Sequence, residues 1–219
     1  PGLNVIVYTS GTEARPKGVR HDAASLLYDS RSMSEFLGLT GDDVFFMPSP
    51  LAHITGLLNG IITPIMLGAT SVLMDRWNAG RALEVIARHG CTYSVMATPF
   101  LQQMFAQDGS ADALRSFRFV RCGGADIPAT LMTAAERAGV TVLRVYGLSE
   151  LPTLTCTHPS STPLQRATTD GMVLPNVELK ILDGDDREQP IGQTGHIVAR
   201  GPELFSGYVD AALDALRAG

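Results

Sequence analysis

Cysteine is scarce in this chain, and its spacing excludes two common kinds of site. The 219 residues include three cysteines, Cys91, Cys122 and Cys156. Their number is odd, they are widely spaced, and they form no Cys-x-x-Cys or Cys/His ligand pattern, so the sequence supports neither a disulfide framework nor a zinc site. A reducing compartment fits best, and we expect a cytoplasmic protein.

Positive charge is also in deficit. The chain carries 17 lysines and arginines against 22 aspartates and glutamates, which gives a formal net charge of -5. Such a balance leaves no basic surface on which nucleic acid or anionic lipid would accumulate. We therefore expect no nucleic-acid partner.

One long segment, Val44 to Met74, has no charged residue at all. A run of that length is compatible with a membrane span. Prolines, glycines, Asn59 and His53 interrupt it, which favours a strand, a turn, a buried helix and a second strand. The chain also begins "PGLNVIVYTS", without the basic region and apolar core of a signal peptide. We expect no membrane span.

Apolar residues, in contrast, are abundant and regularly arranged. Hydrophobic residues make up 45% of the chain and charged residues 18%, which suits a globular core. Short runs rich in Val, Ile, Phe and Tyr alternate with segments of helical period, which indicates a parallel sheet. The predicted strands span 4–10, 43–49, 70–75, 91–98, 117–124 and 140–147, and the predicted helices span 22–37, 53–67, 79–90 and 128–139, with another beginning at 99. We expect an α/β fold, with an open, doubly wound, mostly parallel sheet and helices on both faces.

The alternation of apolar strand-like runs with segments of helical period ends after Tyr146. Ser, Thr and Pro are frequent in 159–176, which we predict to be mostly loop. Beyond it, 177–183 and 195–201 alternate apolar and polar residues around a turn region, the pattern of an antiparallel pair with one wet face. The expected organisation is an α/β unit over 1–158, a linker loop over 159–176 and a second, β-rich unit over 177–219.

Residues with polar or reactive side chains follow the predicted strands, at the edge where a doubly wound sheet binds its ligands. The loop "TSGTEARPKG" after the first strand offers Thr9, Ser10, Gly11, Thr12 and Lys17, an inventory that suits phosphate oxygens. It lacks the Gly-Lys-Ser/Thr order of the best-known phosphate loop. A Gly/Pro surface loop with a solvated lysine is the alternative.

A second cluster, "YGLSE", combines the aromatic face of Tyr146, Gly147, the Ser149 hydroxyl and the Glu150 carboxylate at a strand end. A carboxylate beside a phosphate site is typical of a magnesium ligand, because Mg²⁺ prefers oxygen and bridges protein to phosphate. The alternative is a helix N-terminus, capped by Ser149 and with Glu150 in its first turn.

The motif "CGGADIP" is open to two interpretations. Gly123 and Gly124 would let the backbone touch a flat ligand where the strand ends. A tight strand-to-helix turn, with Pro128 starting the helix, needs the same residues.

His53 stands at the head of an otherwise apolar helix, where it is either a packed or capping residue or a catalytic one. On that helix Gly56, Gly60 and Pro64 follow at intervals of four, which predicts a small-residue groove with a kink. Close helix packing explains this groove as well as a slot for an acyl chain does.

In this order, the motifs resemble those of the AMP-forming acyl-CoA synthetase, or adenylate-forming ligase, family. "TSGTEARPKG" resembles its Thr-Ser-Gly-Thr-Thr-Gly-x-Pro-Lys-Gly loop, "SPLAHITG" its Pro-Leu-x-His-x-x-Gly motif, "CGGADIP" its Gly-Gly-Ala-Pro-Leu-Pro motif and "YGLSE" its Tyr-Gly-x-Thr-Glu motif. The segments "DGMVLPNVELKILD" and "GHIVARGPELFSGY" resemble those that enter and build the family's β-barrel subdomain. The resemblance implies that 1–158 binds nucleotide and acyl groups and that 177–219 begins the barrel.

Members of this family activate a carboxylic acid with Mg-ATP, which gives an acyl-adenylate and pyrophosphate, and pass the acyl group to a thiol, most often CoA. The resemblance therefore implies an acid-thiol ligase that uses ATP, Mg²⁺ and CoA. The apolar helix after His53 favours a hydrophobic, fatty acid as substrate. So does the lack of the aspartate with which amino-acid-activating relatives bind the substrate amine.

The resemblance also implies roles for the matched residues. The β and γ phosphates would be held by Thr9, Ser10, Gly11, Thr12 and Lys17. The α-phosphate would contact Ser149, magnesium would bind Glu150, and adenine would stack on Tyr146 beside Gly147. Gly123, Gly124 and Ala125 would wall the nucleotide and acyl pocket, and His53 would lie beside the carboxylate being activated.

Three departures from the family pattern affect this picture. Glu13 and Ala14 replace the usual Thr-Gly of the phosphate loop, although a carboxylate should repel phosphates and alanine adopts φ > 0 less readily than glycine. Asn176 replaces a glycine in a turn, which asparagine tolerates. The family's Thr-Gly-Asp motif and its lysine-bearing domain do not follow "SGYVD". We expect this chain alone to be inactive and prone to associate, with a homo-oligomer as one form of that association.

Two alternatives stay open. One is an amino-acid or aryl-acid adenylation module that loads a carrier protein. The other is a non-catalytic nucleotide- or acyl-binding remnant, which the missing ribose and lysine motifs favour.

Overall fold

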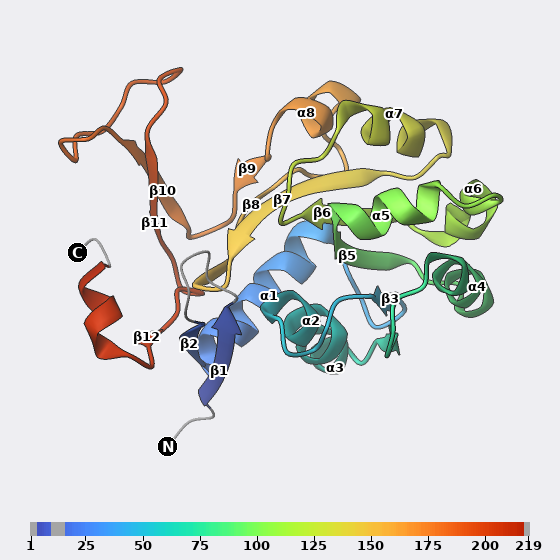
Figure 1. The fold of residues 1–219 in the computed structure, drawn as a ribbon, viewed down its shortest axis with the longest axis horizontal. Coiled ribbons are helices and arrows are strands. Elements are labelled where there is room, and N and C mark those ends of the chain that lie inside the picture. The colour runs from blue at the N-terminus through green and yellow to red at the C-terminus, as the bar shows by residue number, and fades with distance from the viewer. Residues whose placement is uncertain (1–3, 10–15, 217–219) are drawn as a thin grey trace.

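The structure is a computed structural model that describes residues 4–9 and 16–216. Its main sheet has seven strands in the order β4-β3-β5-β6-β7-β8-β9 (Figure 1). The parallel strands are β3 (Val44–Met47), β4 (Thr70–Leu73), β5 (Tyr93–Ala97), β6 (Phe119–Gly123) and β7 (Val142–Leu148). The antiparallel strands are β8 (Leu151–Cys156) and β9 (Met172–Val173). This mixed sheet confirms the predicted α/β class.

Helices cover both faces of the main sheet, as predicted. Met96 and Val120 on one face pack against α4, α5 and α7. Tyr93 and Phe119 on the other face pack against α1. Because residues on both faces are buried, the strands are apolar in long runs, which is typical of a parallel sheet. The bounds of these helices are Ala23–Leu37 (α1), Ala79–His89 (α4), Thr98–Phe105 (α5) and Ala129–Arg137 (α7).

The uncharged segment folds as predicted, with β3, a turn, a buried helical run and β4. The run consists of α2 (Ile54–Leu57), the π-helical turn η1 (Leu58–Ile62) and α3 (Thr63–Leu67). Pro64 cannot donate to the Gly60 carbonyl, which instead accepts the Ser71 hydroxyl at 2.7 Å. The irregularity expected at this proline is thus a wider helical turn. No helix within 4–9 and 16–216 is long and apolar enough to cross a membrane.

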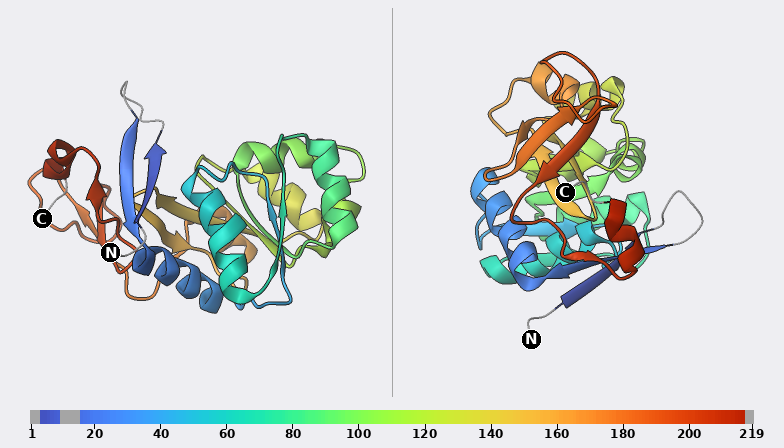
Figure 2. Two further views of the ribbon diagram at one scale, coloured as in Figure 1. Left: turned by 90° about the horizontal axis from the view of Figure 1, so that it is seen from below. Right: turned by 90° about the vertical axis from the view of Figure 1, so that its left-hand side faces the viewer.

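The prediction for the first strand is wrong in one respect, because this strand does not join the main sheet. β1 (Asn4–Thr9) pairs antiparallel with β2 (Lys17–Asp22), and β2 pairs with β12 (Gly207–Tyr208). Ile6 and Tyr8 are 48% and 62% exposed while Val7 is buried, so β1 has one wet face although its sequence is apolar. Figure 2 shows this hairpin between the main sheet and the C-terminal strands.

The interpretation of "YGLSE" as a helix N-terminus is also wrong. Ser149 and Glu150 form the two-residue connection of a hairpin, in which Leu148 of β7 pairs with Leu151 of β8. The segment 159–176, predicted to be mostly loop, also contains β9 and α8 (Pro163–Thr168). The sequence signal for α8 is the capping box that Thr162 and Gln165 form.

The antiparallel pair predicted near the C-terminus is confirmed. β10 (Glu178–Leu182) and β11 (His196–Arg200) form a ladder of their own, which projects away from the main sheet in Figure 1. Asn176, before this ladder, has a φ of 62°, the left-handed conformation expected where it replaces a glycine. The remaining short helices are α6 (Ser110–Ala113), η2 (Leu114–Ser116) and η3 (Ala211–Leu216).

Candidate active site

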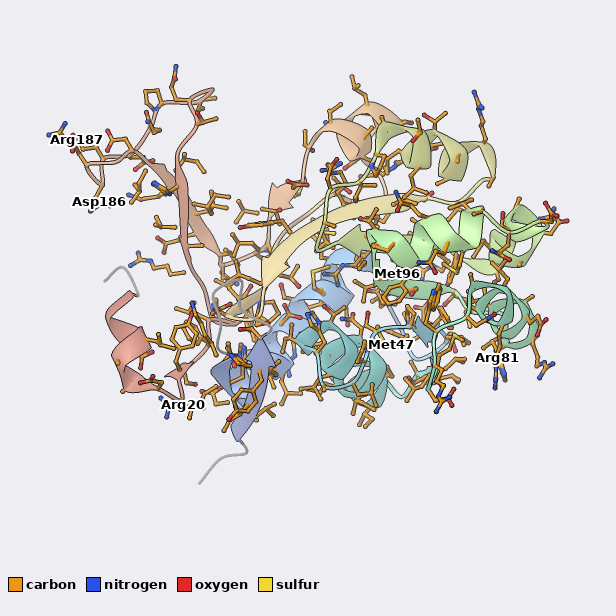
Figure 3. All side chains as sticks on the ribbon, viewed as in Figure 1. Arg20, Met47, Arg81, Met96, Asp186 and Arg187 are labelled. Carbon is orange, nitrogen blue, oxygen red and sulfur yellow. The ribbon has the colours of Figure 1, made fainter. Side chains whose placement is uncertain are left out.

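A cavity of about 340 Å³ lies at the carboxyl ends of β5, β6 and β7. The helical run α2-η1 and the start of β8 complete its wall, which combines apolar residues such as Leu58 and Val95 with polar ones such as Asn59. Met96, one of the lining residues, lies near the middle of the molecule in Figure 3. Predicted site residues from three separate motifs meet in this cavity, namely His53, Gly123, Gly124, Gly147 and Ser149.

His53 caps α2 and lines the cavity at the same time. Its backbone is extended (φ -92°, ψ 146°), and its Nδ1 accepts the Thr55 N–H at 3.2 Å. Burial lowers the pKa of the imidazole, so the ring is neutral at neutral pH. With Nδ1 as the acceptor, the proton of the neutral ring lies on Nε2. Capping and donation to a bound acid are therefore compatible roles for one ring.

The turn that carries Ser149 and Glu150 is held by residues in and beside the three-stranded sheet of β1, β2 and β12. The Ser149 carbonyl accepts from His21 Nε2 at 2.7 Å, and His21 is fully buried, with a pKa lowered by that burial. Glu150 accepts the Tyr208 hydroxyl at Oε1 (2.7 Å), and its carbonyl accepts the Phe205 N–H at 2.8 Å. β2 and the segment around β12 therefore fix this turn.

The hairpin β1-β2 connects the turn to the predicted phosphate loop. Thr9 and Lys17 pair across the hairpin, at the ends of the strands that the loop joins. From Lys17, β2 runs to His21, which reaches the Ser149 carbonyl. Outside the described residues lie the predicted phosphate contacts Ser10, Gly11 and Thr12, together with the departures Glu13 and Ala14.

Gly123 and Gly124 have steric reasons to be glycine. A Cβ on Gly123 would lie 2.3 Å from the Val145 carbonyl oxygen, and Gly124 has a φ of +76°. Both also line the cavity, so the turn and the ligand-contact interpretations are compatible. Ala125 and Tyr146 are not lining residues. Ala125 is exposed, and Tyr146 is half-buried against the core beneath α1.

Gly56 and Gly60 do not form an acyl slot in this cavity. A Cβ on Gly56 would lie 2.1 Å from the Pro50 carbonyl oxygen, and a Cβ on Gly60 would lie 3.0 Å from Leu51 Cδ2. Neither glycine lines the cavity. Close packing of the helical run against residues 47–51 therefore explains these small residues.

The comparison with protein families decides the relationship. A family model described as "AMP-binding enzyme" matches residues 3–209. The chain belongs to this family. That membership confirms the resemblance inferred from the ordered motifs.

Relatives of this AMP-binding chain include several CoA ligases. It is 36% identical over 211 residues to the medium-chain fatty-acid–CoA ligase of Escherichia coli (strain K12). The aligned residues make up 95% of this chain and 37% of that protein. It is 31% identical over 210 residues to the 2-succinylbenzoate–CoA ligase of Enterococcus faecalis, with 94% and 42% covered. The chain thus spans less than half the length of these curated relatives.

Solved structures show the same fold. The anthranilate CoA ligase AuaEII in complex with anthranoyl-AMP matches with a TM-score of 0.87 at 25% identity, over 94% of this chain and 40% of that one. The N-terminal domain of FACL13 from Mycobacterium tuberculosis matches with a TM-score of 0.86 at 24% identity, over 96% and 53%. At 24% identity, the similarity to the FACL13 domain shows a shared fold alone.

Sequence reasoning missed a chain of buried polar residues at the cavity. Arg121 on β6 donates from Nη1 to the Tyr93 hydroxyl (3.1 Å) and from Nη2 to Thr153 Oγ1 (3.2 Å). The Tyr93 hydroxyl donates in turn to Asn59 Oδ1 at 3.2 Å. All four side chains are buried, and Arg121, Thr153 and Asn59 line the cavity. The available signal was a charged residue inside the apolar strand "FRFVRCGG".

The donor set at Glu150 fits magnesium better than a metal held by protein alone. Within the described residues, no group of three or more histidines, cysteines or acids is placed to hold a metal. Magnesium is commonly held by one or two carboxylates, with phosphates and water completing its shell. Glu150 offers one carboxylate, whose Oε1 accepts from Tyr208 while Oε2 remains for a cation. Glu150 could therefore hold Mg²⁺ together with nucleotide phosphates.

Proposed function

We propose that the full-length gene product is an ATP-dependent, AMP-forming ligase that joins an apolar carboxylic acid, preferably a fatty acid, to CoA. One observation carries the proposal: one cavity at the ends of parallel strands brings together His53, Gly123 and Ser149. These residues come from three motifs far apart in the sequence. Ligands of doubly wound sheets bind at this edge.

The proposed reaction has two steps. In the first, a carboxylate oxygen of the acid attacks the α-phosphorus of ATP, and the bond to the bridging oxygen breaks and releases pyrophosphate. In the second, the CoA thiol loses its proton and attacks the acyl carbon, and AMP leaves. Positioning of the reactants and neutralisation of charge supply most of the rate enhancement in such transfers.

The proposed roles are those that the matched motifs imply. Bound magnesium would neutralise phosphate charge beside Glu150. The Ser149 hydroxyl would donate to the α-phosphate. The β and γ phosphates would be held by Thr9, Ser10, Gly11, Thr12 and Lys17. Gly123 and Gly124 would form the cavity wall and Gly147 would contact adenine. Tyr146 and Ala125, which do not line the cavity, would contact the nucleotide from beside it.

His53 would orient the acid. Its Nε2–H can donate to one carboxylate oxygen and leave the other free to attack phosphorus. Because the pKa of the ring is lowered by burial, His53 would hold the acid without protonating it. The attacking oxygen would thus remain anionic.

Two features bear on the acid class. No Asp or Glu occurs among the described lining residues, so the ammonium group of an amino acid would find no counter-ion there. An aryl acid is the second candidate, which the names of 2-succinylbenzoate–CoA and indoleacetate–CoA ligases among the relatives favour. A fatty acid is supported by the apolar lining residues Leu58, Val95 and Val145 and by the name of the Escherichia coli relative.

The proposed organisation places the nucleotide- and acyl-binding subdomain at 1–158, a linker at 159–176 and the start of a β-barrel subdomain at 177–219. The separate β10-β11 ladder supports the last of these. The location of the cavity, lined only by residues from 49 to 153 among those described, supports the first.

ATP–pyrophosphate exchange with a panel of fatty, aryl and amino acids tests the function. We expect exchange with fatty acids, less with aryl acids and none with amino acids. Lys17→Ala should slow exchange, whereas Lys180→Ala, which removes an exposed lysine on β10, should not. Exchange with amino acids and none with fatty or aryl acids would contradict the proposal.

A further inference from the structure

The cavity has one charged side chain deep in its wall. Arg121 precedes Gly123 by two residues on β6, so its Cα lies roughly 6–7 Å further from the carboxyl end of the strand. Among the described lining residues it is the only Lys, Arg, Asp or Glu. The reacting carboxylate is proposed to lie beside His53 and Ser149, at that carboxyl end. Arg121 therefore stands where the far end of a bound acid would lie.

The Arg121 guanidinium is held in place but not saturated. Its hydrogen bonds to the Tyr93 and Thr153 hydroxyls use two of its five N–H groups. The Nε–H has no partner among the described residues, although Arg121 is only 3% exposed. A buried N–H without an acceptor lowers stability, so the guanidinium is held in the cavity wall at a cost.

The counter-charge lies outside the cavity. Burial opposes the charge on Arg121, but Tyr93, Cys156 and Asp29 outweigh it, so the pKa of the guanidinium lies above its ordinary value. Asp29 on α1 is buried and does not line the cavity. The Thr153 hydroxyl lies between them, because it accepts from Arg121 and interacts with Asp29. The cavity is thus lined by the cation and not by its counter-ion.

We propose that Arg121 is a specificity residue, which binds a hydrogen-bond acceptor at the far end of the acid. Preferred substrates then have an apolar middle and a carboxylate or another strong acceptor at the tip. This inference rests on the proposed ligase function and narrows its acid class from fatty acids in general to those that carry such an acceptor at the far end. Val95, which pairs with Arg121, and Val145, which pairs with Gly123, supply the apolar wall between the two ends. A plain alkyl tip would displace water from the guanidinium and offer no acceptor in return.

The test compares matched acids in the exchange assay with the full-length gene product. Each straight-chain monocarboxylic acid from butyrate to decanoate is set beside the dicarboxylic acid of the same length and its monomethyl ester. We expect the acceptor-tipped acids to exceed the plain acid in kcat/KM by ~10-fold or more at the best length, the effect of one hydrogen bond to a charged group.

Two arginine variants locate the effect. Arg121→Met removes the donors and keeps much of the bulk, so it should lower kcat/KM for the tipped acid ~10-fold or more without lowering it for the plain acid. Arg115→Met makes the same substitution at an exposed arginine paired with Asp112 and should change neither. A purely structural role of Arg121 would lower both acids together.

The outcomes separate this inference from the ligase function. If the wild-type protein activates plain acids at least as well as acceptor-tipped acids at every length, the inference is overturned and the ligase function stands. This comparison uses only the wild-type protein, so it does not depend on whether a variant folds. Equal losses for both acids in folded Arg121→Met protein also overturn it. Absence of exchange with every acid defeats the ligase function, and the inference with it.

Discussion

Glu150 and Tyr208 offer a pair of variants that separates a cation-binding carboxylate from a structural one. Glu150→Gln removes the charge that would hold magnesium but keeps an oxygen that can accept the Tyr208 hydroxyl. Tyr208→Phe removes that hydroxyl, which lies 2.7 Å from Glu150 Oε1, and leaves the carboxylate charged. The two variants therefore divide the two functions of one side chain.

The expected effects differ in kind. A hydrogen bond to a charged group contributes about 1.5–3 kcal/mol, and because both residues are only half-buried, Tyr208→Phe should cost about 1 kcal/mol of unfolding free energy. Charge stabilisation by a metal ion is worth several kcal/mol, so Glu150→Gln should slow adenylate formation by ~100-fold or more. Glu150→Gln should also raise the Mg²⁺ concentration needed for half-maximal rate, whereas Tyr208→Phe should not.

ATP–pyrophosphate exchange across a magnesium titration, with urea unfolding of each variant, measures both effects. If Tyr208→Phe slows exchange as much as Glu150→Gln does, and both keep the wild-type magnesium dependence, the reasoning fails. The carboxylate would then act by holding the Ser149–Glu150 turn against β12. An unchanged rate in Glu150→Gln would likewise remove the magnesium role.

Three further predictions concern stability and completeness. Burial, with Asp29 nearby, raises the pKa of Glu203 from 4.5 to about 7, so the folded state binds more protons than the unfolded state between these pH values. The free energy of unfolding should therefore fall as the pH rises from 4.5 to 7. Urea unfolding of Glu203→Gln should show a weaker dependence on pH over this range. Gly123→Ala should cost about 1–3 kcal/mol in the same assay because its Cβ meets Val145, whereas Gly184→Ala, with open space around it, should not. Because the chain spans 37% of its Escherichia coli relative, the isolated 219-residue chain should form no acyl-CoA, and thioester detected by mass spectrometry would contradict this.

The parallel part of the sheet was predictable because strands buried on both faces have continuous apolar runs in the sequence. β3, β5 and β6 are covered on both faces, so their residues are apolar without alternation, and each run ends where a loop or helix begins. The β10-β11 pair has the opposite pattern, with one wet face, and was predicted from alternation. In both cases the local sequence contains the information that fixes the strand.

Two of the strands that were missed, β2 and β8, depend on partners rather than on local composition. β2 is rich in polar residues, and its pairing with β12 joins Val19 to Tyr208 across most of the chain. β8 contains Pro152, which weakens a strand prediction, and its pairing depends on the two-residue turn after Leu148. Long-range pairing of this kind leaves little periodic signal in a single sequence.

In the candidate site, too, residues with a local sequence signal were predicted, and residues that depend on distant contacts were not. His53 was identified with its capping alternative, and the structure shows that one ring can serve both purposes because its two nitrogens face different tasks. The motif glycines were identified, and their steric reasons depend on neighbours such as Val145, which only the fold brings near. His21 and Tyr208 were not identified, because their importance lies in contacts with the Ser149–Glu150 turn.

Arg121 departs from the rule that made its strand predictable. A central parallel strand favours apolar residues, and replacing a buried ion pair by apolar residues of similar volume is often neutral or stabilising. Arg121 instead introduces a buried charge, a partner network that includes Tyr93 and Thr153, and an N–H without an acceptor among the described residues. Proteins retain such local conflicts mainly at functional sites, where the cost in stability is offset by binding. The position at which the strand pattern fails is therefore the one in the cavity wall at which selection among acids is expected.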